Sequence, residues 1–270
     1  MASFATNHQK TSVLSTLREA WALRRVWWFT ATARTRARFA RTLFGSFWLG
    51  FSNLFSIAVL AIVYGTVFKV QDFKSYVVYL GLGLTIWNSI AAAIGNAPNL
   101  FEHNARHVHN TNVNPIFYTL EEWAFQVQTF LQSFLMVLIA LSLFQATLIP
   151  HFLMAGWLPL LNLLLFLYWL PALVCLLGAR YRDIYQLVPI VLQLVFLLSP
   201  ILYQKKNLGT FAWTADLNPI YHILSPFRHS IIAGSLLGGH DFVLLVVNLA
   251  GIWWVTWLIN RERRWLPFLI

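Results

Sequence analysis

Charged residues and cysteines are scarce in this chain. Only 10% of its 270 residues are Asp, Glu, Lys or Arg and 59% are hydrophobic, whereas a soluble domain carries about 25% charged residues. The composition excludes a soluble globular protein, and the division of the apolar residues among many segments predicts a polytopic membrane protein. The single cysteine, Cys175, lies inside an apolar run and excludes an intrachain disulfide framework.

Acidic residues are especially few, with nine Asp and Glu against 19 Lys and Arg. The net charge of +10 does not indicate nucleic-acid binding, because the basic residues cluster at the ends of apolar runs, where they set topology and contact anionic lipids. The aspartates are dispersed, and no carboxylate pair or Ser/His arrangement can be assembled from their spacing. We therefore expect no catalytic residues and no enzyme activity in this chain.

A nucleotide-binding motif is also missing. Gly81 and Gly83 form a lone G-x-G inside an apolar run, which favours close helix packing rather than phosphate binding. Any ATP-driven process would therefore need a separate ATPase polypeptide, and we expect no cofactor in this chain. The basic N-terminal region has no early apolar core, so we expect no cleavable signal peptide.

Apolar runs, in contrast, are long and numerous. A hydrocarbon core of about 30 Å needs about 20 helical residues. Their number predicts an all-α integral membrane protein with six transmembrane helices and both termini on one side. The six segments are Phe47–Phe68, Tyr76–Ala97, Phe125–Ile149, Leu158–Leu177, Leu187–Tyr203 and Phe242–Ile259.

The basic residues predict the orientation. With the termini inside, fourteen of the 19 Lys and Arg lie on the inner side and five on the outer side. The positive-inside rule therefore places both termini in the cytoplasm.

Residues 1–45 form a basic arm before the first span, and residues 46–270 form the six-span domain. From Leu14 to Trp28, leucine and tryptophan follow helical spacing, with Arg18, Arg24 and Arg25 interleaved. This pattern predicts an amphipathic helix that lies in the membrane interface, with its arginines on lipid phosphates. An ordinary cytosolic helix is the alternative.

Two connections differ in character. Asn99–Trp123, predicted inside, is polar and contains His103, His107 and His109. Two histidines four residues apart can hold a metal on a helix, but we favour a contact surface for a partner and expect no metal. Lys205–Asp241, predicted outside, is half apolar, which predicts a re-entrant pair of outer helices between spans five and six. Such backbone is tolerated only against protein or a water-filled cavity.

A charged segment, Arg180–Tyr181–Arg182–Asp183, separates spans four and five. Charges this close to a span are costly unless they lie at the interface, and Asp183 can pair with its neighbouring arginines. The segment is either a topology anchor or a functional elbow, and we favour the functional elbow.

Aromatic residues make up 16% of the chain. Aromatic faces stack on sugar rings, so side chains within or beside the spans could line a path for a glycan; packing and lipid contact are the alternative for each one. The candidates are Tyr64, Tyr79, Trp87, Tyr168 and Tyr203.

The sharpest sequence features occur in a fixed order. They are Gly178-x-x-Tyr181–Arg182–Asp183–Ile184, Leu198–Ser199–Pro200–Ile201-x-Tyr203, Leu217–Asn218–Pro219 and Phe227–Arg228. With the basic arm, six spans and polar first inner loop, this series resembles the permeases of ABC-2 type transporters. The resemblance is to the polysaccharide-export branch (Wzm, capsule-exporter and teichoic-acid-exporter permeases) and covers nearly the whole chain.

The resemblance implies a bacterial cytoplasmic-membrane protein, two copies of which pair with two P-loop ATPase subunits that bind ATP and Mg. The assembly would export an undecaprenyl-diphosphate-linked glycan such as O-antigen. Arg24 and Arg25 would meet the diphosphate, and Arg228 would join the aromatic residues along the path. The residues expected to couple to the ATPase are Glu102, Arg106, His107, Arg180, Arg182 and Asp183.

The chain departs from the family pattern at two places. Asn114–Pro115 stands where a Phe-Pro or Leu-Pro is common, and Gln204–Lys205–Lys206 replaces the acidic residues of capsule-type relatives. The alternatives are a capsule or teichoic acid exporter, an ABC-2 exporter of drugs or small lipids, and an integral glycosyl- or acyltransferase. The lack of an acidic cluster in the loops disfavours the enzyme.

Overall fold

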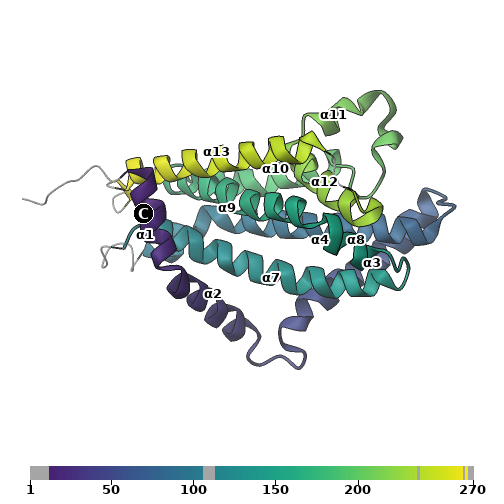
Figure 1. The fold of residues 1–270 in the computed structure, drawn as a ribbon, viewed down its shortest axis with the longest axis horizontal. Helices are drawn as coiled ribbons and strands as arrows, with labels where there is room; N and C mark the ends of the chain where they lie inside the picture. Colours follow the sequence, from purple (N-terminus) through teal and green to yellow (C-terminus); the bar gives the residue numbers. More distant parts are fainter. Residues whose placement is uncertain (1–11, 106–112, 236–237, 264, 267–270) are drawn as a thin grey trace, which may run out of the picture.

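The described part of the chain is helical throughout. The computed structural model describes residues 12–105, 113–235, 238–263 and 265–266, and these contain no β-strand. The long helices run side by side along the longest axis of the molecule (Figure 1). We call the end that holds α1 (Val13–Ala22) the arm end, and the opposite end, where α8 (Leu148–Ala155) lies, the distal end.

Five helices are long and apolar enough to cross a membrane. All are at least 20 residues long, which gives a rise of about 30 Å or more. They are α3 (Trp48–Val67, preceded by the 3₁₀ turn Gly45–Phe47), α4 (Phe73–Asn96), α7 (Ile116–Ser142), α9 (Trp157–Arg180) and α13 (Gly239–Glu262).

The sixth apolar helix is shorter than a span. α10 (Ile184–Leu198) has 15 residues, a rise of about 22 Å. It begins earlier than the predicted Leu187 and ends at Ser199–Pro200, so the predicted fifth span through Tyr203 is helical over only part of its length. The helix stops because Pro200 has no N–H to continue the ladder and disfavours helical backbone at Ser199.

The third span differs from its predicted bounds, Phe125–Ile149. α7 begins at Ile116, directly after Pro115, and ends at Ser142, and α8 follows as a separate helix. Proline suits this position because the first N–H groups of a helix have no intrahelical acceptor. The earlier start places Glu121 and Glu122 inside the helix rather than in a loop.

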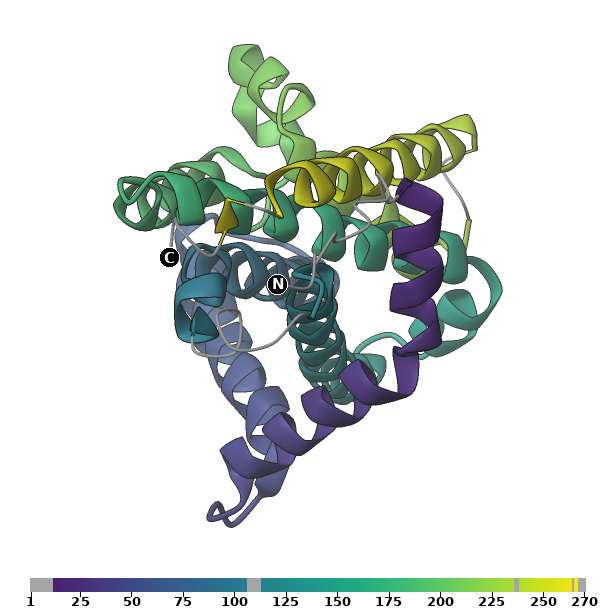
Figure 2. The same ribbon diagram turned by 90° about the vertical axis from the view of Figure 1, so that its left-hand side faces the viewer.

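The arm consists of two helices where the sequence predicted one. α1 ends at Ala22, and α2 (Arg24–Phe39) sets off in a new direction, so that the pair wraps around one side of the arm end (Figures 1 and 2). Trp27 bridges the bend, since its indole donates to the Ala20 carbonyl over 3.0 Å. Trp27 also packs edge-on against Trp123 of α7 with ring centroids 5.9 Å apart, which docks α2 on the bundle.

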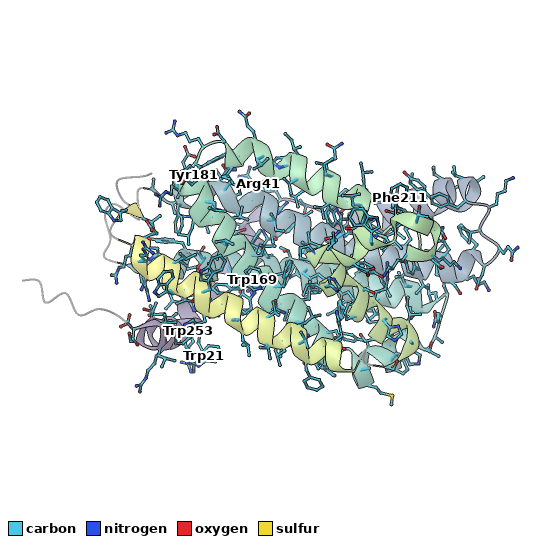
Figure 3. The ribbon with its side chains drawn as sticks, turned by 90° about the horizontal axis from the view of Figure 1, so that it is seen from above. Trp21, Arg41, Trp169, Tyr181, Phe211 and Trp253 are labelled. Carbon is cyan, nitrogen blue, oxygen red and sulfur yellow. The ribbon has the colours of Figure 1, made fainter. Side chains whose placement is uncertain are left out.

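The bundle is centred on α4, which is 72% buried over its most apolar stretch, whereas α3 is 17% buried. Two consecutive side-chain hydrogen bonds hold α3 in place: Asn88 donates to Asn53 over 2.7 Å, and Asn53 donates to Ser133 over 2.6 Å. Another side-chain hydrogen bond joins the middle of α9 to α13, where Trp169 (labelled in Figure 3) donates to Asn248 over 2.9 Å. Such bonds stabilise helix contacts where apolar burial gives little driving force.

The connection predicted to be re-entrant contains three short helices: η3 (Lys205–Phe211), α11 (Trp213–Asp216) and α12 (Pro219–Ala233). η3 and α11 project from the bundle (Figures 1 and 2). α12 instead packs back against α8, α9 and α4. Lys205 pairs with Asp216 across the projecting part, and the hydrogen bond from Lys205 to this carboxylate raises the pKa of Lys205.

Candidate functional site

The distal site is built around the turn that ends α10. Ser199 has extended backbone angles, and its hydroxyl donates to the Val195 carbonyl over 2.6 Å. The amide of Asn218 donates to the same hydroxyl over 2.6 Å, and the Asn218 carbonyl oxygen accepts from the N–H of Ile220 and so caps α12. Ser199 and Asn218 therefore fix the end of α10 against the start of α12.

Three side chains donate to the carbonyls of residues 200–203. Arg228 Nη1 lies 3.1 Å from Pro200 O, and the Tyr76 hydroxyl lies 2.7 Å from Leu202 O. The Tyr79 hydroxyl lies 3.0 Å from Pro200 O and 3.2 Å from Tyr203 O. We call Tyr76, Tyr79 and Arg228 the Tyr–Arg cluster. It satisfies carbonyls of the non-helical backbone that follows α10, where no helical ladder supplies donors.

The positive charge of the cluster is held by an aromatic ring. Arg228 is 5% exposed, and no acidic side chain lies within ion-pair distance of it in the described chain. Its guanidinium carbon lies 3.6 Å from the centre of the Tyr79 ring, a cation–π contact that gains strength when it is desolvated. Gly83 makes room for it, because a Cβ there would lie 3.1 Å from Arg228 Nη1.

The structure brings only some of the predicted path residues together. Tyr79 and Arg228 meet at the Pro200 turn, where Tyr203 takes part through its backbone carbonyl, while its own hydroxyl donates to the Leu197 carbonyl over 2.7 Å. Trp87 packs against Phe196 with ring centroids 5.4 Å apart. The others lie elsewhere: Tyr64 stacks on Phe68, Tyr168 is buried against Trp123, and Arg24 and Arg25 are exposed at the start of α2.

The arm end brings two predicted coupling segments into contact. The Tyr185 hydroxyl, in the first turn of α10, donates to Glu102 of α5 (Leu100–His103) over 2.9 Å. Close by, Gly178 of α9 touches the turn before α5, where a Cβ would lie 2.7 Å from the Cα of Pro98. The glycine of the charged-segment motif thus permits close approach of backbone to backbone. Arg106 and His107 lie outside the described residues.

The charged segment is organised differently from the expected local pairing. Arg180 lies 4.0 Å from Glu262 at the end of α13, and its guanidinium stands over the Tyr181 ring at 5.6 Å. Arg182 and Asp183 are exposed, and Asp183 has no basic partner within 4.0 Å among the residues described. Pairing within the segment was therefore a wrong expectation, because Glu262 is brought to Arg180 by the packing of α13 on α9.

The arm end also contains a polar cavity that the sequence did not lead us to expect. It has a volume of about 640 Å³ and lies between α2, α5 and α7. Arg34 of α2 donates to Glu122 of α7 over 2.5 Å, and Glu122 accepts from Gln126 over 2.8 Å. The spacing of Arg34 and Arg38, one helical turn apart, was a usable signal, but the late predicted start of the third span left Glu122 in a loop.

No three His, Cys, Asp or Glu side chains group as metal ligands within the described ranges. Of the three histidines of the first inner loop, His103 lines the arm-end cavity, and His107 and His109 lie outside the described residues.

Comparison with known proteins adds one sequence family to this geometry. The model of a family described as ABC-2 type transporter matches residues 28–232, most of the chain. The match begins in α2 and ends in α12, so it includes the Tyr–Arg cluster and the Glu102–Tyr185 contact. A comparison with curated proteins finds no match.

Proposed function

The chain belongs to the ABC-2 type transporter family, and on that premise we propose that it is the permease of an exporter of undecaprenyl-diphosphate-linked polysaccharide such as O-antigen. Membership makes it a multi-pass transmembrane subunit of an ABC transporter, whose ATPase is a partner. The polysaccharide cargo is the proposed part.

One observation carries the choice of cargo. Three of the four motifs that resemble the polysaccharide-export branch contribute Ser199–Pro200, Asn218 and Arg228 to a single turn, whereas the fourth, from Gly178 to Ile184, lies at the arm end. Three motifs that build one local structure support the branch more strongly than motifs that are all scattered over the fold. The hydroxyls and the cation of this structure also suit a hydroxyl-rich cargo.

The proposed assembly contains two copies of this chain and two P-loop ATPase subunits, which bind ATP and Mg. It lies in a bacterial cytoplasmic membrane among membrane lipids, with both termini in the cytoplasm, and binds no nucleic acid. In this orientation the arm end faces the cytoplasm. Arg24 and Arg25 are proposed to meet the diphosphate of the substrate, and the aromatic residues named above are proposed to line the path of the sugar.

The contact between Glu102 and Tyr185 suggests how ATP hydrolysis reaches the path. An ATPase that moves the α5 loop, with Arg106 and His107, would move the first turn of α10 through this bond. α10 is one helix, with Pro189 inside it, whose far end carries the Pro200 turn, so a push at Glu102 would be transmitted along it to the Tyr–Arg cluster. Arg180, Arg182 and Asp183 lie at the same elbow and are proposed to contact the ATPase. Transmission through a helix of this kind is common in transporters.

The test has two parts. Deletion of the gene should deplete the lipid-linked glycan at the cell surface and raise its level inside the cell. The tagged protein, purified in mild detergent from native membranes, should bring a P-loop ATPase with it. A normal surface glycan would remove the polysaccharide cargo, whereas the absence of any ATPase would contradict the assembly.

A further inference from the structure

The arm-end cavity has the properties of a ligand site. Its volume of about 640 Å³ lies within the range of about 300–1,000 Å³ usual for small-molecule sites. Its wall comes from α2, the end of α4 with the following 3₁₀ turn η2 (Ala97–Asn99), α5 and α7. The partly open cavity is formed by three stretches of the chain, residues 34–38, 96–104 and 118–125, so it is a product of the fold rather than of one loop.

The charges that line the cavity balance. α2 contributes Arg34 and Arg38, and α7 contributes Glu121 and Glu122. Arg34 is already bound to Glu122 over 2.5 Å and stands 4.3 Å from the centre of the Phe125 ring. A phosphate or diphosphate placed here would face two carboxylates as well as two guanidinium groups, so the cavity offers little net attraction for an anion.

The remaining polar side chains are the amides of Asn96, Asn99 and Asn104, the imidazole of His103 and the phenol of Tyr118. Asn96, Asn99 and His103 line the cavity, and within the described chain their side chains make no hydrogen bond to protein. An amide carries two donor hydrogens and an acceptor oxygen, and an imidazole has one of each when neutral. These three side chains therefore offer both donors and acceptors, which suits a sugar hydroxyl, since that group both donates and accepts.

We propose that this cavity is a saccharide-binding site that receives sugar residues close to the lipid end of the transported glycan. The inference rests on the proposed export of a glycan. Asn96 and Asn99 would bind ring hydroxyls, His103 would complete the polar wall, and the Arg34–Glu122 pair would form a fixed surface behind the ligand. The proposal separates the sugar from the diphosphate, which Arg24 and Arg25 are proposed to bind outside this cavity.

A labelling experiment tests the site directly on the full chain in lipid nanodiscs. His103→Cys places a thiol on the cavity wall, Thr42→Cys places one on the exposed connection after α2, and the buried native Cys175 serves as the blank. The probes are N-acetylglucosamine, methyl α-mannoside and inorganic pyrophosphate, each at millimolar concentration. We expect one or both saccharides to slow maleimide labelling at position 103 several-fold and to leave position 42 unchanged.

Two labelling outcomes would overturn the proposal. The first is an unchanged rate at position 103 with both saccharides. The second is protection by pyrophosphate alone, which would make the cavity an anion site.

An export assay distinguishes failure of this site from failure of the proposed function. The double variant Asn96→Leu/Asn99→Leu should lower surface glycan at least several-fold at matched permease levels, while Arg36→Gln, on an exposed part of α2, should not. If the double variant exports normally while deletion of the gene abolishes export, only the cavity assignment fails. If deletion has no effect on the glycan, the proposed function itself fails. If the double variant does not accumulate in the membrane, the labelling result alone decides.

Discussion

At the scale of single residues, the Tyr79 side chain stabilises the turn after α10 through both its hydroxyl and its ring. It is the donor available to the Tyr203 carbonyl, and its ring carries the Arg228 guanidinium. Tyr79→Phe keeps the ring and removes the hydroxyl, so it should lower the free energy of unfolding by about 1–2 kcal/mol, because the part-buried Tyr203 carbonyl loses its donor. Denaturant unfolding of the purified protein measures this loss.

Tyr64→Phe is the matched control, since the Tyr64 hydroxyl has no hydrogen bond among the described residues, and the ring that stacks on Phe68 and packs against the core is kept. It should leave the unfolding midpoint unchanged. Equal midpoints for both variants would show that the bond from Tyr79 carries no stability.

Arg182 poses a different question, because it is exposed and its role is not packing. If it only anchors topology, Arg182→Lys keeps the positive charge and is harmless. If it contacts the ATPase, lysine cannot reproduce the planar, multi-donor guanidinium. We expect glycan export to fall several-fold at matched permease levels, whereas Arg261→Lys at the end of α13 should export normally. Wild-type export by Arg182→Lys would leave the segment an anchor.

At the scale of elements, the close contact of α9 with the turn before α5 depends on Gly178. A methyl group there would lie 2.7 Å from Pro98 Cα, against backbone that cannot yield. Gly178→Ala should therefore cost about 1–3 kcal/mol of stability through overpacking. Gly95→Ala, also in a helix, meets its nearest neighbour at 3.7 Å and should be neutral or stabilise by up to about 1 kcal/mol. Thermal unfolding of the two variants side by side measures the difference, and similar midpoints would refute it.

The packing of α2 against α7 should weaken when Glu122 loses its charge. Glu122→Gln removes the charge that holds Arg34, so α2 should open more often and its backbone amides should exchange hydrogen several-fold faster. Glu19→Gln on α1, where Glu19 makes no ion pair with any described residue, is the control. Hydrogen exchange read by mass spectrometry tests this, and unchanged exchange in residues 24–39 would show that the tryptophan contacts alone dock the helix.

Sequence patterns predicted the elements well where the length and apolar content of a run determine a helix. They predicted poorly where a helix boundary or contact depends on which other helix packs against it. The apolar runs located five spans, whereas the fifth predicted segment was carried through Tyr203, beyond the end of α10 at Leu198. The start of α7 was placed too late because Glu121 and Glu122 look like loop residues until α2 supplies Arg34. Nothing in the sequence places Tyr76 and Tyr79 beside residues 200–203, since that contact depends on how α4 and α10 pack.

At the scale of the whole molecule, Asn104 and Asn207 lie at opposite ends. Asn104 lines the arm-end cavity, and Asn207 lines a hollow of about 430 Å³ beside Tyr203 at the distal end. With both termini inside, an impermeant thiol reagent added to intact cells should label Asn207→Cys and leave Asn104→Cys unlabelled. Permeabilised cells, in which both cysteines should react, provide the control. The reverse pattern in intact cells would refute the orientation.

The carbonyls of residues 200–203 set a condition on any movement of α10 away from α4. Such a movement strips Leu202 and Tyr203 of their donors and Pro200 of one of its two, and each unmatched group in a nonaqueous layer costs several kcal/mol. Displacement is therefore an exchange reaction, in which each tyrosine hydroxyl must be replaced by another hydroxyl. Water can supply it, and so can a sugar. The hydroxyls of a polyhydroxylated cargo could themselves donate to these carbonyls as the tyrosines leave. An apolar cargo of the same width has no such donors, so its passage would leave the carbonyls unpaired.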